Sequence, residues 1–343
     1  MPLSNDLTKP WSIWHERLHK TLKSKSTLLP PGAALLLSVS GGQDSMVLLQ
    51  LMMDLQRIYK WKLNVWHGDH GWHEQSQQIA KELKEWCERK NLPFYLSTTT
   101  KQQISTEQKA RDWRYANLLE QVKKLTQRDP SMHCKHVVTG HTGSDRAETL
   151  IMNLARGTNL GGLSSLKEKR QLSEDIELVR PILIFSRQET LQICQERDIP
   201  IWIDPSNANT LFARNKIRKE VMPILESLHP GSTIRIAQLA DRLSNINHDQ
   251  NDLTSLAIEA VKNSNGINRK KIMNLSKTAR ATLLAKWIKE NKINSLSANQ
   301  LLELSEKVSK NKQPGSIQIS EKCQIEWCKE SINISNKSSV SNK

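Results

Sequence analysis

A short segment rich in glycine and serine, SVSGGQDSMVLL at residues 38–49, carries groups that could bind an anion. It directly follows an apolar run, so its glycines stand where a buried strand is expected to end and a helix to begin. Gly41 and Gly42 permit backbone angles that a side chain would forbid, and the amide N–H groups of such a turn can converge on an anion beside a helix N-terminus. Ser40 and Ser45 add hydroxyl donors for phosphate oxygens.

Gln43 and Asp44 complete this motif, and Asp44 is its unusual member because a carboxylate repels a neighbouring phosphate. An acid here is useful if it helps to hold a Mg²⁺ ion that bridges the phosphate, or if it caps the helix. The motif is not a Walker A loop, because the pattern GxxxxGK[ST] is absent. A glycine turn capped by Asp44 is the plain alternative, but the complete SGGxDS pattern favours a phosphate site.

Two further acids, Asp145 and Glu148, lie three residues apart at the predicted start of another helix, so their carboxylates can face the same way. Such a pair suits an ammonium group or a magnesium ion. The same spacing is also typical of a helix-capping pair, and the two roles can coexist. His141 lies shortly before them, after a predicted strand, and is a third group that could take part in proton transfer.

Two clusters of basic residues suit an anionic substrate. Arg111 and Arg114 lie beside Trp113 and Tyr115, which favours phosphate contact with base stacking, or a solvated helix face with the tryptophan buried. The guanidinium groups of the second cluster could bind a phosphate or a carboxylate, or lie on ordinary surface. Its members are Arg214, Asn215 and Arg218.

Other polar candidates have a structural alternative of equal weight. His67 and His70 could border a nucleotide or a base, or be buried for structural reasons. A third group could belong to a site or form a proline-containing turn. This group consists of Asp204, Ser206 and Asn207.

The elements that must position these residues alternate along the first 220 residues. Strands are predicted at 33–39, 63–67, 94–99, 135–140 and 177–185, and helices near 44–59, 75–91, 107–126, 145–156 and 187–198, after an opening helix from Trp11. Such alternation predicts an α/β fold with a parallel sheet covered on both faces. Ligands of these folds bind beyond the carboxyl ends of the strands, which is where the candidate residues lie.

The alternation ends near the HPG at 229–231, and helical periodicity follows. We therefore expect a catalytic domain at 1–228 and a smaller, mainly helical domain at 229–332, with two short strands, SIQIS and CQIEWC, near its end. Residues 333–343 are low in apolar content and are expected to be a disordered tail.

Composition narrows the class of protein. The 343 residues suggest two domains. No run approaches the roughly 18 apolar residues that span a bilayer, and the N-terminus lacks the apolar core of a signal peptide, so we expect a cytoplasmic protein. The five cysteines are scattered without a CxxC, which argues against a disulfide framework or a tetrathiolate zinc site, and His133, Cys134 and His136 are expected in a surface loop. The formal charge of +15 favours a nucleic-acid partner, although a basic protein without such a partner is equally compatible.

The SGGQDS loop after a strand resembles the pyrophosphate loop of the N-type ATP pyrophosphatases, which adenylate a carbonyl or amide oxygen. Four more segments resemble, in the same order, those of one such family, the tRNA(Ile)-lysidine synthases. They are HGDHGW (67–72), ARDWRY (110–115), TGHTGSDRAETLIMNLARGTNLGGL (139–163) and DPSNANTLFARNKIR (204–218). The first departs from the family pattern HxNHGxR, because Asp69 replaces the frequent Asn and Trp72 and His73 stand where Leu and Arg would be.

The resemblance implies an ATP- and Mg²⁺-dependent reaction that joins free L-lysine to the wobble cytidine of an isoleucine tRNA with a CAU anticodon. Cytidine O2 would attack the ATP α-phosphate and release pyrophosphate, and the lysine ε-amine would then displace AMP at C2, which changes decoding from AUG to AUA. The implied catalytic residues are Asp44, His141, Asp145 and Glu148, with 40–45 as the nucleotide loop and Asp44 as a Mg²⁺ ligand. The implied substrate-binding residues are His70, Arg111, Arg114, Asp145, Glu148, Arg214, Asn215 and Arg218.

The second step needs a base, because a lysine ε-amine with a pKa of about 10.4 is neutral in only about one molecule per few thousand at pH 7. Asp145, Glu148 and His141 are the candidates, although a helix N-terminus keeps carboxylates ionised. Two rival functions remain open, a tRNA thiolase and a tRNA-binding protein without chemistry. The oligomeric state is also open, with a homodimer as one possibility.

Overall fold

The computed structural model describes residues 11–71, 75–100, 106–129, 132–164, 166–202, 213–264, 266–291, 293, 296–309, 313–320 and 323–336. Contacts between Cα atoms divide the chain into two compact units, Met1–Ser244 and Asn245–Lys343. The first unit therefore extends past the expected boundary at 228/229 and includes the first turns of helix α10 (Ser232–Val261). It does so because Ala237 of α10 packs with Ala147 and Met222 in a small core of the first unit.

The first unit is built on a six-stranded sheet in the order β3-β2-β1-β4-β6-β5. Its strands are β1 (Ala34–Ser38), β2 (Lys62–Asp69), β3 (Phe94–Thr98), β4 (His136–Thr139), β5 (Lys169–Gln171) and β6 (Glu177–Val179). Neighbouring strands are parallel, except that β5 pairs antiparallel with β6. The predicted parallel α/β fold is confirmed.

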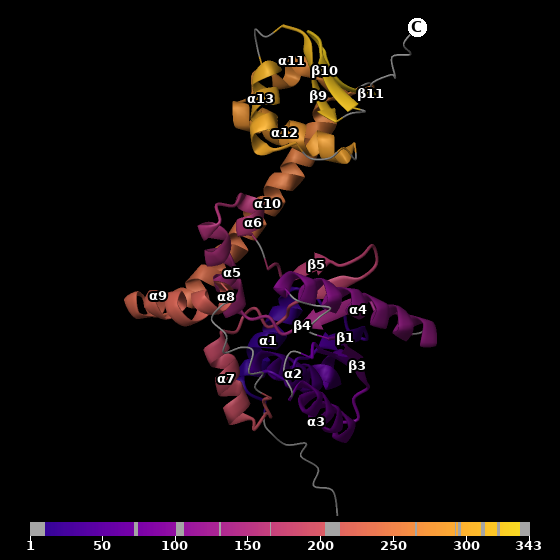
Figure 1. Cartoon of the computed structure of the whole chain (residues 1–343), viewed down its shortest axis with the longest axis vertical. Coiled ribbons are helices and arrows are strands. Elements are labelled where there is room, and N and C mark those ends of the chain that lie inside the picture. The colour runs from indigo at the N-terminus through magenta and orange to yellow at the C-terminus, as the bar shows by residue number, and fades with distance from the viewer. Residues whose placement is uncertain are drawn as a thin grey trace, which may run out of the picture. The chain divides into compact units, whose positions relative to one another are not determined.

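Helices of this unit cover both faces of the sheet (Figure 1). The helical elements of this unit, besides the start of α10, are α1 (Ile13–Ser24), α2 (Gln43–Tyr59), α3 (Ser76–Arg89), α4 (Glu107–Arg128), α5 (Gly143–Ala155), α6 (Leu160–Leu163), α7 (Arg187–Glu196), α8 (Ala213–Lys216), the π-helix η3 (Ile217–Val221) and α9 (Met222–Leu228). Leu35 and Leu37 of β1 pack in a core with α1, α2, α3 and α7, whereas Leu36 packs in a second core with α4. Alternation along β1 thus separates two buried layers.

Two details of the sheet differ from the sequence prediction. Strand β6 ends at Val179, not at residue 185, because Pro181 has no N–H for a ladder and the chain turns over 181–184. The edge strand β5 was not predicted, since its three residues KRQ carry no apolar pattern.

The second unit combines helices with a five-stranded antiparallel sheet in the order β7-β8-β11-β10-β9. Its elements besides α10 are α11 (Arg269–Ile272), α12 (Lys277–Glu290), α13 (Ala298–Lys307), β7 (Lys262–Asn263), β8 (Gly266–Asn268), β9 (Gly315–Ser320), β10 (Cys323–Trp327) and β11 (Ser331–Asn336). The two predicted strands correspond to β9 and β10, but three more are present. Residues 333–336 of the expected tail belong to β11, which is anchored by fully buried Ile332.

From the sequence we expected no membrane-spanning segment and no disulfide framework. No helix in the described parts of the chain has both the length and the apolar character needed to cross a membrane. All five cysteines are free, and burial raises the pKa of Cys87 and Cys194 to about 12 and that of Cys134 to about 11. The surface loop expected at His133, Cys134 and His136 is wrong for its last two members, because Cys134 is buried and His136 begins β4.

Substitution of Leu37 by Ala should lower the free energy of unfolding of the first unit by about 2–5 kcal/mol, because it opens a cavity in the core beneath the glycine-rich loop. The measurement is urea denaturation followed by tryptophan fluorescence. The matched control is Leu96→Ala on β3, where the side chain is 47% exposed and the expected loss is below about 1 kcal/mol. Equal losses in the two variants would contradict this account of the core.

Candidate active site

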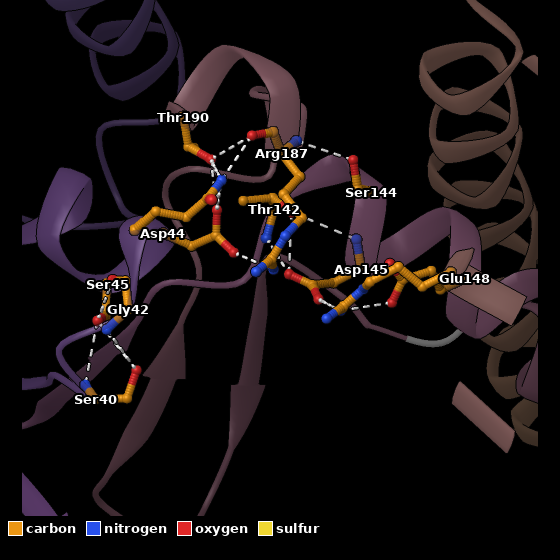
Figure 2. Close-up of polar contacts among 12 residues, drawn as sticks. Ser40, Gly42, Asp44, Ser45, Thr142, Ser144, Asp145, Glu148, Arg187 and Thr190 are labelled. Atoms are coloured by element: carbon orange, nitrogen blue, oxygen red, sulfur yellow. Dashed lines mark hydrogen bonds and ion pairs between the residues drawn. The ribbon is translucent and has the colours of Figure 1, made fainter. Parts of the chain in front are cut away.

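The loop between β1 and α2 is closed by its own hydrogen bonds (Figure 2). The Ser40 amide donates to Ser45 Oγ at 3.2 Å, and Ser45 Oγ donates to the Gly42 carbonyl at 2.8 Å. Gly41 has a φ of 88°, a conformation that favours glycine. Gly42 is the N-cap of α2, so the loop leads into the unpaired N–H groups of a first helical turn. The predicted anion loop is therefore preformed.

A second loop, between β4 and α5, lies directly against this anion loop. A Cβ atom on Gly140 would lie 2.9 Å from the Ser45 Cα and 3.0 Å from the Asp44 carbonyl carbon. Because both of these are main-chain atoms, only glycine allows the approach. Gly140 was not singled out from the sequence, since a glycine after a strand is also common in ordinary turns.

Trp202 fixes the anion loop from another side. Its backbone N–H donates to the Gly41 carbonyl at 2.9 Å, and its indole N–H donates to Glu82 of α3 at 2.7 Å. The chain beyond it, 203–212, contains the candidates Asp204, Ser206 and Asn207 and lies outside the described residues. Trp202 thus connects the anion loop to the segment that leads into α8.

Asp44 in the first turn of α2 is held by residues of α7. Arg187 Nη1 lies 2.8 Å from Asp44 Oδ2, and the Thr190 hydroxyl lies 2.5 Å from Asp44 Oδ1. The Gln43 amide donates to the Arg187 carbonyl at 2.7 Å and to Thr190 Oγ1 at 2.9 Å, so Gln43 joins α2 to α7. Burial raises the pKa of Asp44, and Arg187 opposes that rise. Neither Arg187 nor Thr190 was predicted, because neither belongs to a recognisable pattern.

Asp145 and Glu148 both face inward from the start of α5. The Thr142 N–H donates to Asp145 Oδ2 at 2.8 Å and the Asp145 N–H returns to Thr142 Oγ1, so Asp145 does cap the helix. Its other oxygen accepts from Arg214 Nη2 at 2.8 Å. Capping and pairing with Arg214 therefore coexist, because each uses a different carboxylate oxygen.

Two guanidinium groups enclose the Glu148 carboxylate, which is only 2% exposed. Arg218, in π-helix η3, binds it in a bidentate manner, with Nε at 2.7 Å from Oε1 and Nη2 at 2.8 Å from Oε2. Arg214, in α8, donates from Nε to Glu148 Oε2 at 3.1 Å. Segments 139–163 and 204–218, which the sequence offered as separate motifs, thus meet through buried ion pairs.

Burial and these arginines set the charge states of the cluster. Burial alone would raise the pKa of Asp145, but the Arg214 guanidinium, with His141, the Thr142 amide and Arg218, holds that pKa below its usual value. Burial opposes the charged form of Arg218 as well, yet its bonds to Glu148 raise its pKa. Both groups are therefore ionised at neutral pH.

His141 lies in the same electrostatic environment. Its Nδ1 is 2.9 Å from Thr139 Oγ1. Burial lowers the pKa of His141, with Arg180, Arg214 and Arg114 acting in the same direction and Asp145 opposing them. With its pKa lowered to about 3, the imidazole is neutral at physiological pH and is a weak base.

The anion loop and the carboxylate pair belong to one site. The charge of Asp145 raises the pKa of Asp44, and the charge of Arg218 lowers it. Figure 2 shows Asp44, Arg187 and Asp145 side by side, on α2, α7 and α5. The loop predicted to bind phosphate and the buried pair of acids therefore lie next to each other.

The predicted residue Arg111 lies beside Tyr115 of α4, together with Arg170 and Arg180, which were not predicted. Arg111 and Arg170 lie over the Tyr115 ring, at 5.6 and 4.6 Å from its centroid. Burial raises the pKa of Tyr115, but hydrogen bonding by Arg170 and the charges of Arg111 and Arg180 bring it below the usual value. This makes a strongly positive region beside the site.

Arg114 of α4 lies next to His70, the residue that follows β2. Arg114 Nη2 is 3.4 Å from His70 Nε2, and Trp113 packs edge-on to His70 with its ring 4.9 Å away. Trp113 also packs against the core, which agrees with its structural alternative. His67 is 5% exposed and bonds to the Val39 carbonyl at 2.8 Å, which supports a structural role.

The remaining candidates are Asn215, a metal-binding cluster and the cysteines. Asn215 lies beside Arg214 in α8 and is half-buried. Within the described residues no group of three or more His, Cys, Asp or Glu side chains is arranged to hold a metal ion. The buried cysteines have raised pKa values, so they do not supply the reactive thiolate that a thiolase would use.

The fold and the site define a PP-loop domain, and a family model described as the PP-loop domain matches residues 12–225. A solved structure with this fold is the U34-tRNA thiolase NcsA from Methanococcus maripaludis, with a TM-score of 0.51 and 18% identity over 67% of this chain and 78% of that one. A tRNA(Ile)-lysidine synthase of Prochlorococcus marinus is 59% identical over 98% of this chain and 100% of the relative. Another, from Parasynechococcus marenigrum, is 42% identical over 94% of each chain. The chain belongs to the tRNA(Ile)-lysidine synthase family.

Substitution of Gly140 by Ala should weaken ATP binding by at least about tenfold, since the added methyl group forces the two loops apart. Isothermal titration calorimetry measures the affinity, and circular dichroism checks that helix content is kept. An affinity equal to that of the unsubstituted protein would show that the close approach does not shape the nucleotide site.

Proposed function

We propose that the chain is an ATP-dependent ligase that joins free L-lysine to C2 of the wobble cytidine in a tRNA(Ile) with a CAU anticodon. The observation that carries this proposal is the phosphate loop beside the buried acids Asp145 and Glu148. The loop suits the phosphates of ATP, and the two acids suit the ammonium group of lysine. Lysidine formation needs ATP and lysine in one site. Relatives named tRNA(Ile)-lysidine synthase match nearly the whole chain and support the same activity.

In the proposed first step cytidine O2 attacks the ATP α-phosphorus, the bond to the β-phosphate breaks, and its electron pair leaves with pyrophosphate. The loop Ser40–Ser45 would bind the departing phosphates through its main-chain N–H groups and two hydroxyls. Because the loop is already closed by the Ser45 hydrogen bonds, it needs little rearrangement to do so.

Asp44 fits the role of a Mg²⁺ ligand. Its carboxylate is buried beside the loop, and carboxylate and phosphate oxygens are the donors that Mg²⁺ prefers. When bound, Mg²⁺ would neutralise charge on the phosphates and on the departing pyrophosphate. The Thr190 hydroxyl would orient Asp44 Oδ1 for this purpose.

In the proposed second step the lysine ε-nitrogen attacks C2, and AMP leaves with the former O2. Asp145 and Glu148 would hold the lysine ammonium in place of the guanidinium groups that now pair with them. Arg214 and Arg218 would then be available for the lysine carboxylate or an RNA phosphate. Burial, with Arg214 and other arginines, lowers the pKa of His141 to about 3, and Arg214 holds that of Asp145 at about 2, so both groups are weak bases while Arg214 lies beside them.

The tRNA would contact the positive region around Tyr115, where Arg111 and Arg114 supply phosphate contacts and His70 a stacking surface. We assign rejection of methionine tRNA, which shares the anticodon, to the second unit, Asn245–Lys343. A tRNA substrate is consistent with a cytoplasmic enzyme.

Incubation with ATP, Mg²⁺ and labelled lysine should label isoleucine tRNA with a CAU anticodon and leave the methionine tRNA unlabelled. Scintillation counting of the precipitated tRNA gives the answer. Pyrophosphate release that depends on tRNA but gives no lysine label would mean that the nucleophile is different. No signal of either kind would exclude the proposed ligase.

Asp44→Asn and Glu148→Gln should fail at different steps. Asp44→Asn should suppress tRNA-dependent pyrophosphate release by about a hundredfold or more, because it removes the carboxylate that would hold Mg²⁺ beside the phosphates. Glu148→Gln should retain more of that release and raise the lysine concentration needed for half-maximal labelling by about tenfold. The control is Glu120→Gln. The Glu120 side chain is exposed on α4 and pairs with Lys124. Equal loss of pyrophosphate release in both site variants would show that the roles are wrongly divided.

A further inference from the structure

Arg187, the first residue of α7, is the least explained charged residue of the site. Its guanidinium contacts Asp44 of α2, and its backbone N–H donates to Ser144 Oγ of α5 at 3.0 Å (Figure 2). Helix α7 therefore contacts two other helices at this residue. They are α2, which follows the anion loop, and α5, which carries the acid pair.

The main chain of Arg187 is fixed while its head group is accessible. The carbonyl accepts the Gln43 amide at 2.7 Å and the hydroxyl of Thr190, a residue with no exposed surface. The side chain of Arg187 is 37% exposed, whereas that of Asp44 is 14% exposed. The guanidinium can thus change partners without movement of α7.

The present partner uses little of what the guanidinium offers. The contact with Asp44 joins one nitrogen, Nη1, to one oxygen, Oδ2. A guanidinium has five N–H donors in a planar fork that matches phosphate in a bidentate manner, and such charge-assisted pairs are the stronger ones. A polyphosphate on the neighbouring loop would therefore compete well for Arg187.

We propose that Arg187 is a pyrophosphate-binding residue that transfers from Asp44 to the phosphate oxygens of bound nucleotide. This inference rests on the proposed adenylation step. As the oxygen–phosphorus bond to cytidine O2 forms and the bond to the β-phosphate breaks, the electron pair stays on pyrophosphate, and Arg187 stabilises that charge without transfer of a proton. The exchange leaves the Asp44 carboxylate without its cationic partner.

The test is calorimetric titration of the full-length protein with inorganic pyrophosphate in Mg²⁺ buffer, with AMP as the second ligand. Arg187→Gln should weaken pyrophosphate binding by at least about tenfold and leave AMP binding unchanged. Arg187→Lys, which keeps the charge but loses the fork, should give an intermediate loss and guards against a folding defect in the first variant. The matched control is Arg17→Gln in α1. The Arg17 side chain is 41% exposed and pairs with Glu189 of α7, the helix that begins with Arg187.

Pyrophosphate affinity that is unchanged in Arg187→Gln would overturn the inference, and so would an equal loss of AMP affinity. If Arg187 served only to neutralise Asp44, its removal would instead lower the Mg²⁺ concentration needed for half-maximal pyrophosphate release. Failure of the proposed function is distinguishable, because it would abolish lysine labelling in the unsubstituted protein while the dependence of pyrophosphate binding on Arg187 persisted.

Discussion

The buried carboxylate of Glu148 is the constraint on which the rest of the site depends. A buried, ionised acid is tolerated only when it is paired and hydrogen-bonded, and removal of a partner from a buried pair typically costs about 3–5 kcal/mol. Here Arg214 and Arg218 supply the pairing from a part of the chain remote in sequence. The same interaction therefore folds α8 and η3 onto α5.

The parallel sheet brings the loop after β1, which leads to Asp44, next to the loop after β4, which leads to Asp145 and Glu148. Strands β1 and β4 are neighbours, so the loops that follow them meet at one edge of the sheet. The absence of a side chain at Gly140 allows these loops to touch. The charge of Asp145 consequently raises the pKa of Asp44, which couples the proposed phosphate site to the proposed ammonium site. Adenylation and lysine attack could then take place without movement of the tRNA between two centres.

Much of this could be predicted from the sequence, because strand–helix alternation and the SGGQDS motif are local patterns. The parallel sheet and the preformed loop at Ser40–Ser45 follow from them. Arg187 could not be found, since a single arginine at a helix start has no signature until the fold brings it to Asp44. The sheet of the second unit was also largely missed, because β7 and β8 are short and polar and are recognised only through their pairing. Strand β11 alternates isoleucine with polar residues as β9 does, but most of it lies where a disordered tail was expected.

The central claim is that the chain activates cytidine O2 by adenylation, and its most direct test follows that oxygen atom. A tRNA(Ile) carrying ¹⁸O at O2 of the wobble cytidine is incubated with the enzyme, ATP, Mg²⁺ and lysine, and the AMP formed is measured by mass spectrometry. The account predicts one ¹⁸O atom in the phosphate of each AMP molecule. AMP free of ¹⁸O, formed while lysine enters the tRNA, would contradict it.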